Sequence, residues 1–275
     1  MTNILKINQL LASCAFAASQ TVFGATTLSV GDVSIIGYSS DGVDEVSFIT
    51  WVDLDSDTQI SFTDRGWRSG ANEFTKNPSD NPATPGLSPG DGNLTWSPNV
   101  PVVAGSIITA TFANNNPDTA TWSLGLSNGD FGHSGLTSGG ESIFAYQGTA
   151  SSPNLIFGLY FDDTTWSSSD PGEYSLGPSQ LPFALNTAIG NIVVPVDSTN
   201  DNAFYSGSFN DQSNLLDYRS SVLDNSNWTI SNTDDITNDN LHGVFPSGGF
   251  ETIPEPSTAL LLGLCGVASL RRRRK

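Results

Sequence analysis

The sequence predicts an all-β fold, and three observations lead to this prediction. Short runs rich in β-branched and aromatic residues recur along the chain. Between them Gly, Pro, Asn, Asp and Ser form dense clusters that are typical of turns, for example at 40–42 and 89–92. Both cysteines, Cys14 and Cys265, lie in terminal apolar segments, so residues 25–253 must be held together by a core rather than by disulfides. That length fits one large β domain.

Eight runs between residues 33 and 196 are expected to form strands. The run at 46–54 carries bulky residues on both faces, which favours a central position in a sheet. In chain order the expected strands are Val33–Tyr38, Val46–Leu54, Gln59–Thr63, Asn93–Ser97, Ser106–Phe112, Ser142–Gln147, Asn154–Tyr160 and Asn191–Val196.

One segment, 211–228, has the periodicity of a helix instead. Its apolar residues fall on one side at helical spacing: Leu215, Leu216, Val222 and Leu223. We expect one short helix there. Residues 69–92 are rich in Pro, Asn, Gly and Asp and are expected to form a long surface loop. The β domain is assigned to 25–246, and 247–253 to a linker.

The N-terminal residues 1–24 have the pattern of a secretory signal peptide, which we expect to be helical. Lys6 gives a positive charge, an apolar stretch follows at 10–18, and small residues precede Ala25, where cleavage is expected. A lipobox-like run that ends at Cys14 is the alternative, with a lipid on that cysteine. Both alternatives predict export through the secretion machinery.

The C-terminal residues 254–275 combine three features in a fixed order. Pro254, Glu255 and Pro256 come first. An apolar run at 258–270 follows, shorter than the roughly 20 residues that span a bilayer as a helix. A basic cluster ends the chain and would stay on the cytoplasmic side of a membrane: Arg271, Arg272, Arg273, Arg274 and Lys275.

This order resembles the PEP-CTERM sorting signal. The resemblance implies an exosortase as partner, a membrane transpeptidase that would cleave near the Pro-Glu-Pro motif. It also implies transient insertion of a short hydrophobic helix at 258–270, and then delivery to the cell surface or the extracellular matrix. A permanent C-terminal membrane anchor is the alternative.

The body shows a second, weaker resemblance, which rests on the order of many short pieces. They include Gly31–Tyr38, Phe48–Asp53, Thr58–Asp64, Gly92–Trp96, Gly140–Gly148, Asn202–Tyr205 and Asn227-Trp228. Over residues 28–245 this order resembles the lamin-tail-like family of secreted domains. The resemblance implies an immunoglobulin-like β-sandwich that acts as an accessory or surface module, and it carries over no catalytic residue. The loop at 69–92 is longer than this family would lead us to expect.

Charge excludes one class of function. The chain has 28 acidic and 10 basic residues and a net charge of −18. Within residues 25–253 only four basic residues remain: Arg65, Arg68, Lys76 and Arg219. A nucleic-acid binder needs Lys and Arg to neutralise phosphates, so nucleic acid is not an expected partner.

Calcium is the one cofactor for which the composition offers ligands. Asp53, Asp55 and Asp57 open a twelve-residue window that ends at Asp64, with much of the oxygen spacing of an EF-hand loop. Position 6 is Thr58 rather than the Gly of that loop, and no helices flank it. The alternatives are a calcium site elsewhere in this acidic body, including Asp162-Asp163 or Asp234-Asp235 in turns, and an acidic hairpin turn without metal.

Six tryptophans provide candidate surfaces for sugars. Trp67 lies in a turn between two arginines and Trp166 in a Ser/Asp loop, so these two are the candidate ligand-binding rings. Trp51 and Trp96 lie in expected strands and are assigned to the core. Packing of Trp67 and Trp166 in the core or at its edge remains the alternative.

Catalysis has little support. His133 and His242 are expected in turns, and the Gly-His-Ser-Gly run at 132–135 lacks the last glycine of a nucleophile elbow. A pair of carboxylates for glycoside hydrolysis is harder to exclude, with Asp64, Glu73, Glu141 and Glu173 as candidates. The sequence therefore predicts an exported, non-enzymatic protein with a structural or adhesive role in extracellular polysaccharide. A carbohydrate-binding module and a secreted hydrolase are the alternatives.

Overall fold

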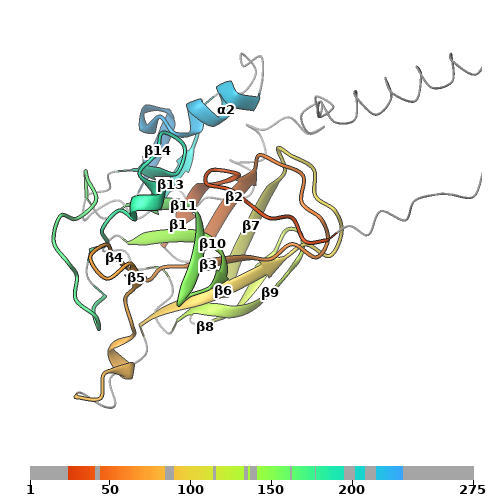
Figure 1. Ribbon diagram of the computed structural model, residues 1–275. Helices are drawn as coiled ribbons and strands as arrows, with labels where there is room; N and C mark the ends of the chain where they lie inside the picture. The colour runs from red at the N-terminus through yellow and green to blue at the C-terminus, as the bar shows by residue number, and fades with distance from the viewer. Residues whose placement is uncertain are drawn as a thin grey trace, which may run out of the picture.

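Two six-stranded β-sheets lie face to face in the computed structural model (Figure 1). The structure describes residues 24–40, 44–83, 90–113, 116–132, 136, 141–161, 163–176, 178–194, 202–207 and 215–231. Almost the whole predicted signal peptide and all of the sorting tail lie outside this part of the chain. The predicted all-β sandwich with long loops and one short helix is confirmed.

The first sheet has the strand order β14-β13-β1-β2-β7-β8, and all its neighbours are antiparallel. The first strand in sequence, β1, therefore pairs with β13, which is one of the last two strands of the sheet. The strands are β1 (Val33–Ser39), β2 (Glu45–Thr50), β7 (Ile107–Ala113), β8 (Asn116–Trp122), β13 (Asn202–Tyr205) and β14 (Trp228–Ser231).

The second sheet has the order β12-β11-β10-β3-β6-β9. β12 runs parallel to β11, and the other pairs are antiparallel. Its strands are β3 (Ile60–Thr63), β6 (Asp91–Ser97), β9 (Leu126–Gly132), β10 (Ser142–Thr149), β11 (Ser152–Tyr160) and β12 (Asn191–Val193). A small hairpin is formed by β4 (Trp67–Arg68) and β5 (Glu73–Phe74). The fold is completed by the helix α2 (Leu215–Val222) and the 3-10 turns η1 (Pro78–Asp80), η2 (Phe183–Leu185) and η3 (Asn225–Asn227).

Aromatic side chains fill the space between the sheets. The Phe48 ring, from the first sheet, lies 5.1 Å from the Phe62 ring and 5.2 Å from the Trp96 ring of the second. Trp51 and Trp96 are buried, as expected for core residues. On β6 the buried residues alternate with more exposed ones, so one face points to this core and the other to solvent.

A second apolar cluster covers part of the outer face of the second sheet. On β10, Ile143 and Ala145 belong to the central core, whereas Phe144 and Tyr146 belong to the outer cluster. The hairpin β4–β5 supplies Trp67 and Phe74 to this cluster, and η2 supplies Leu185. β10 is therefore buried on both faces over its first five residues.

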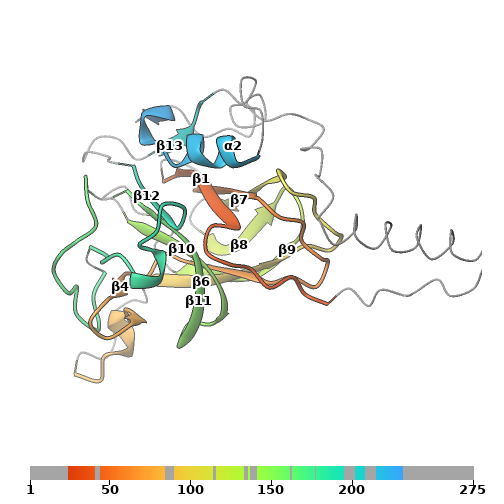
Figure 2. The ribbon, with the colours of Figure 1, turned by 45° about the horizontal axis from the view of Figure 1, so that its top comes forward.

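The helix α2 (Leu215–Val222) lies beside β13 and β1 in both views (Figure 1, Figure 2). The expected helix is thus present, but its buried face differs from the expected one. Tyr218 and Val222 are buried, whereas the side chain of Leu216 is 70% exposed. Among the residues that the structure describes, no helix is long and apolar enough to cross a membrane.

Candidate acidic site at the end of the second sheet

Three carboxylates meet where three neighbouring strands begin or end. β3 lies between β10 and β6 and is antiparallel to both, with Thr63 opposite Phe144 on one side and Asn93 on the other. The C-terminal end of β3 is therefore beside the N-terminal ends of β6 and β10. Asp64 directly follows β3, Asp91 opens β6, and Glu141 directly precedes β10. We call these three residues the acidic triad.

The carboxylates of the triad are close together. One oxygen from each residue can be chosen so that all three lie within 4.8 Å of one another. In the described part of the chain, no other group of three His, Cys, Asp or Glu side chains meets this condition. Asp64 is only 4% exposed, and its two partners are partly buried.

Asp64 is held by the neighbouring strand through one of its two oxygens. The backbone N–H of Gly92 donates to Asp64 Oδ1 over 2.7 Å, and the Thr63 hydroxyl donates to the carbonyl of Gly92 over 2.6 Å. The second oxygen, Asp64 Oδ2, is buried and has no hydrogen-bond partner. A buried carboxylate oxygen without a partner is costly, because it has lost its water and gained nothing in return.

Burial raises the pKa values of Asp64 and Asp91, and repulsion from neighbouring carboxylates adds to the shift of Asp64. The pKa of Asp64 lies well above its ordinary value, first because of burial and then because of the negative charges of Glu141 and Asp91. Burial raises the pKa of Asp91 to about 6, although the positive charge of Arg65 acts in the opposite direction. Close carboxylates of this kind either keep a proton or are neutralised by a cation.

Two of the four carboxylates that were candidates for hydrolysis belong to the triad. Asp64 and Glu141 come together there, and Asp64 is only 4% exposed. The other two candidates form ion pairs elsewhere. Glu73 Oε1 lies 2.8 Å from Arg68 Nη1, and Glu173 Oε1 lies 2.5 Å from Lys76 Nζ.

The four carboxylates of the predicted calcium loop do not lie together in one group. Asp53 Oδ1 accepts the backbone N–H of Ala104 over 2.8 Å, and Asp55 Oδ2 accepts the hydroxyl of Thr26 over 3.4 Å. Asp57 is exposed. Of the four predicted ligands only Asp64 belongs to the acidic triad, because β3 carries it to the far end of the strand from the other three.

The two candidate tryptophans are packed against the outer face of β10 and β11. Trp67 is 2% exposed and makes an edge contact with Phe74 at 5.0 Å, so its ring is not an exposed platform. Trp166 is partly buried and stacks on Tyr160 at 4.8 Å, while its indole N–H donates to Asn191 Oδ1. Both rings pack in the outer apolar cluster that covers part of the second sheet.

Asp91 is the site residue that the sequence did not single out. It stood in a run of Pro, Gly and Asp that was read only as a turn. The position of Asp91 is the signal that could have identified it. Asp91 lies at the start of a strand, and Glu141 lies at a similar place, directly before β10. The histidines His133 and His242, and the sorting residues Pro254, Glu255, Pro256 and Arg271–Arg274, lie outside the described residues.

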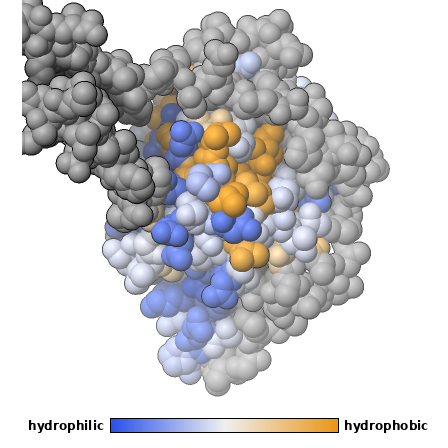
Figure 3. All heavy atoms as spheres, turned by 90° about the vertical axis from the view of Figure 1, so that its right-hand side faces the viewer, coloured by the Kyte–Doolittle hydropathy of each residue, from blue (hydrophilic) through white to orange (hydrophobic). Residues whose placement is uncertain are grey.

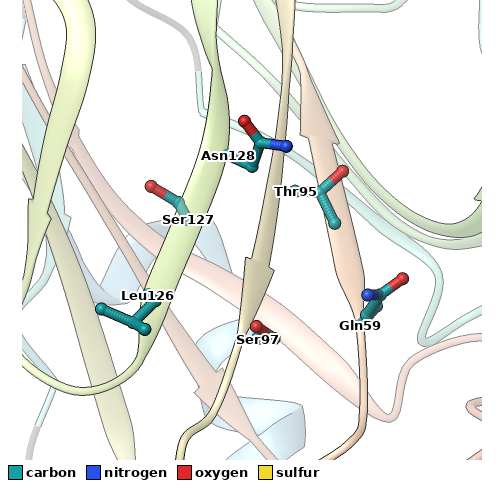
Figure 4. A pocket seen from close by; sticks show the side chains of 6 residues that line it. All are labelled: Gln59, Thr95, Ser97, Leu126, Ser127 and Asn128. Atoms are coloured by element: carbon teal, nitrogen blue, oxygen red, sulfur yellow. The ribbon is translucent and has the colours of Figure 1, made fainter.

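A shallow polar hollow lies on the solvent side of the second sheet, at the opposite end of β6 from Asp91. Its volume is about 360 Å³, and it spans the ends of β3, β6 and β9 (Figure 4). The residues that line it are Gln59, Thr95, Ser97, Leu126, Ser127 and Asn128. Five of these six side chains end in a hydroxyl or an amide.

Comparison with known proteins identifies the tail. Residues 252–275 match the PEP-CTERM protein-sorting motif, which confirms the resemblance of the C-terminal residues. No curated protein and no solved structure matches the chain, so the resemblance of the body to lamin-tail-like domains remains a prediction. The motif indicates that this chain is an exported protein sorted by an exosortase.

Proposed function

We propose that the β-sandwich is a non-catalytic structural or adhesive domain, displayed at the cell surface or in the extracellular matrix after sorting. The sorting motif at residues 252–275 supports delivery to the envelope. The acidic composition, with a net charge of −18, suits a hydrated surface protein. Polysaccharide is the proposed partner, and no catalytic group is needed for this role.

The polar hollow is the observation that carries this proposal. Hydroxyl and amide side chains form hydrogen bonds with sugar hydroxyls, and an apolar side chain such as Leu126 packs against the C–H face of a sugar. Leu126 is 66% exposed, and exposed Val100 and Val103 lie on the connection that follows Ser97. Figure 3 shows a molecular face on which apolar side chains gather beside hydrophilic ones. Exposed apolar patches of this kind are typical of binding surfaces.

The first prediction tests this surface. The purified full chain is incubated with the extracellular polysaccharide of the producing cells, and the bound fraction is measured over a concentration series. We expect saturable retention that falls about tenfold in the double variant Thr95→Ala/Asn128→Ala, because two hydrogen-bonding groups are lost at roughly 0.5–1.5 kcal/mol each. Thr121→Ala is the matched control, since Thr121 is also an exposed strand residue but lies on β8 of the other sheet.

Two outcomes would contradict the proposal. Equal loss in the Thr121→Ala control would mean that the hollow is not the binding surface. Turnover of a glycoside or ester by the purified chain would contradict its non-catalytic role. Loss of binding in Trp166→Phe alone would favour the tryptophan-based carbohydrate module instead, and would place its ligand over β11 rather than over β6.

A further inference from the structure

The acidic triad has a feature that a group of surface carboxylates does not have. Asp64 is more than nine-tenths buried, yet its Oδ2 has no hydrogen-bond partner. Its Oδ1 is already bound by the N–H of Gly92, and this bond fixes the position of the carboxylate. The triad as a whole brings three negative charges together, while Arg65 is the one basic side chain whose charge acts on Asp91. The geometry therefore leaves one buried carboxylate oxygen, Asp64 Oδ2, without a hydrogen-bond partner beside two further acidic side chains.

The spacing of the oxygens is compatible with one bound calcium ion. Calcium binds oxygen ligands at about 2.3–2.6 Å, so two ligands on opposite sides of the ion are about 4.6–5.2 Å apart. The three chosen oxygens lie within 4.8 Å of one another, which is inside that span. Calcium accepts carboxylate oxygens in a flexible geometry, whereas magnesium needs stricter octahedral geometry with ligands at about 2.0–2.1 Å.

We propose that Asp64, Asp91 and Glu141 form a calcium site that joins the ends of β3, β6 and β10. The ion binds the unpartnered Oδ2 of Asp64 and one oxygen of each of the other two carboxylates, and water completes its coordination. These three strands are neighbours in the second sheet. The ion therefore joins them at the end of the sheet that lies away from the polar hollow. This site is distinct from the Asp53–Asp57 turn, and it does not depend on polysaccharide binding.

The test uses the purified full chain with calcium chloride as the probe. Thermal unfolding is followed in chelator and in calcium, with sodium chloride added to match the ionic strength, and calcium binding is measured by calorimetry. At a calcium concentration about 100-fold above Kd, we expect the melting temperature to rise by roughly 5–10 °C, with one ion bound per chain.

Variants identify the ligands. Asp64→Asn keeps the shape of the side chain and the acceptor for Gly92, but removes the charge, so the calcium-dependent shift should disappear. Glu141→Gln is a second variant at a less buried position, and it should weaken calcium binding at least tenfold. Asp57→Asn is the matched control, because this exposed carboxylate belongs to the other candidate loop, and it should respond to calcium like the wild type.

Each other outcome overturns the proposal. If calcium stabilises all four proteins equally, the ion acts only on the general surface charge. If Asp57→Asn alone loses the response, the calcium site is the 53–57 turn. If the wild type shows no shift while Asp64→Asn is more stable in chelator, the triad holds a shared proton and not a cation.

Discussion

At the scale of single residues, the acidic triad makes the stability of the protein depend on pH. Asp64, Asp91, Glu141 and the basic Arg65 are the charged groups at this site. The pKa of Asp91 is about 6 in the folded state, above the ordinary 3.8 expected on unfolding. The folded state therefore holds its proton more tightly, and its stability falls as the pH rises from about 4 to about 6.

The second prediction follows from this fall in stability with rising pH. In chelator, the free energy of unfolding of Asp91→Asn should exceed that of the wild type at pH 7, and the difference should vanish below about pH 4. A shift of this size corresponds to at most about 3 kcal/mol, and solvent screening at the partly exposed Asp91 reduces it to roughly 1–2 kcal/mol. Urea unfolding at a series of pH values measures the difference. Parallel profiles for the two proteins would contradict it.

The sequence identified one member of the triad and could not identify the set. Asp64 was named twice, as the last ligand of a calcium loop and as a candidate hydrolytic carboxylate. Its real neighbours are 27 and 77 positions away in the chain, and pairing between β3, β6 and β10 is what brings them near. Strand pairing depends on contacts between distant segments, and local patterns in the sequence do not reveal which segments pair.

At the scale of elements, the attachment of β9 to β6 depends on a glycine. Gly129 of β9 has a φ of 92°, and a Cβ added there would lie 2.3 Å from the carbonyl oxygen of Asn93 on β6. Gly172 has a nearly identical φ of 95°, but the nearest atom to an added Cβ is 3.9 Å away. A methyl group at Gly172 would therefore cause backbone strain alone, whereas a methyl group at Gly129 would cause both backbone strain and steric overlap.

The third prediction compares these glycines. Gly172→Ala should lower the free energy of unfolding by about 1 kcal/mol through backbone strain alone, whereas Gly129→Ala should lower it by about 2–4 kcal/mol. The extra loss arises because β6 and β9 must move apart to accept the methyl group. Equal losses of unfolding free energy in the two variants, measured by urea unfolding, would show that β9 accepts the methyl group without any additional loss of stability.

Most long apolar runs could be predicted as strands, whereas polar strands and the short strands β13 and β14 were missed. The runs around β1, β10 and β11 were found within a few residues of their ends. β8 and β9 were missed because their sequences are rich in Asn, Asp, Gly and Ser, which are residues typical of turns. The expected strand at 46–54 ends at Thr50, and Leu54 continues it only as an isolated bridge to Val102. The side of α2 was misjudged because Tyr218 packs inward in place of Leu216.

At the scale of the whole molecule, the excess of acidic residues causes electrostatic repulsion between side chains of the folded state. Few basic side chains offset this charge, and Arg68 and Lys76 bind local carboxylates in the cover of the second sheet. The fourth prediction is that raising sodium chloride from about 10 to 150 mM increases the melting temperature by a few degrees, because the screening length falls from about 30 to 8 Å. A decrease would mean that the exposed ion pairs contribute more than the general repulsion.

The pairing of β1 with β13 also determines when the protein can fold during export. The Ser39 hydroxyl donates to Asn202 Oδ1 over 2.8 Å, across a separation of 163 residues. A chain that leaves the cytoplasm with its amino terminus first presents β1 long before β13 has crossed. The first sheet therefore cannot close until nearly all of the domain is outside, and such distant pairing is slow to form. The same topology that holds the finished sandwich together therefore makes completion of the first sheet one of the last steps of folding.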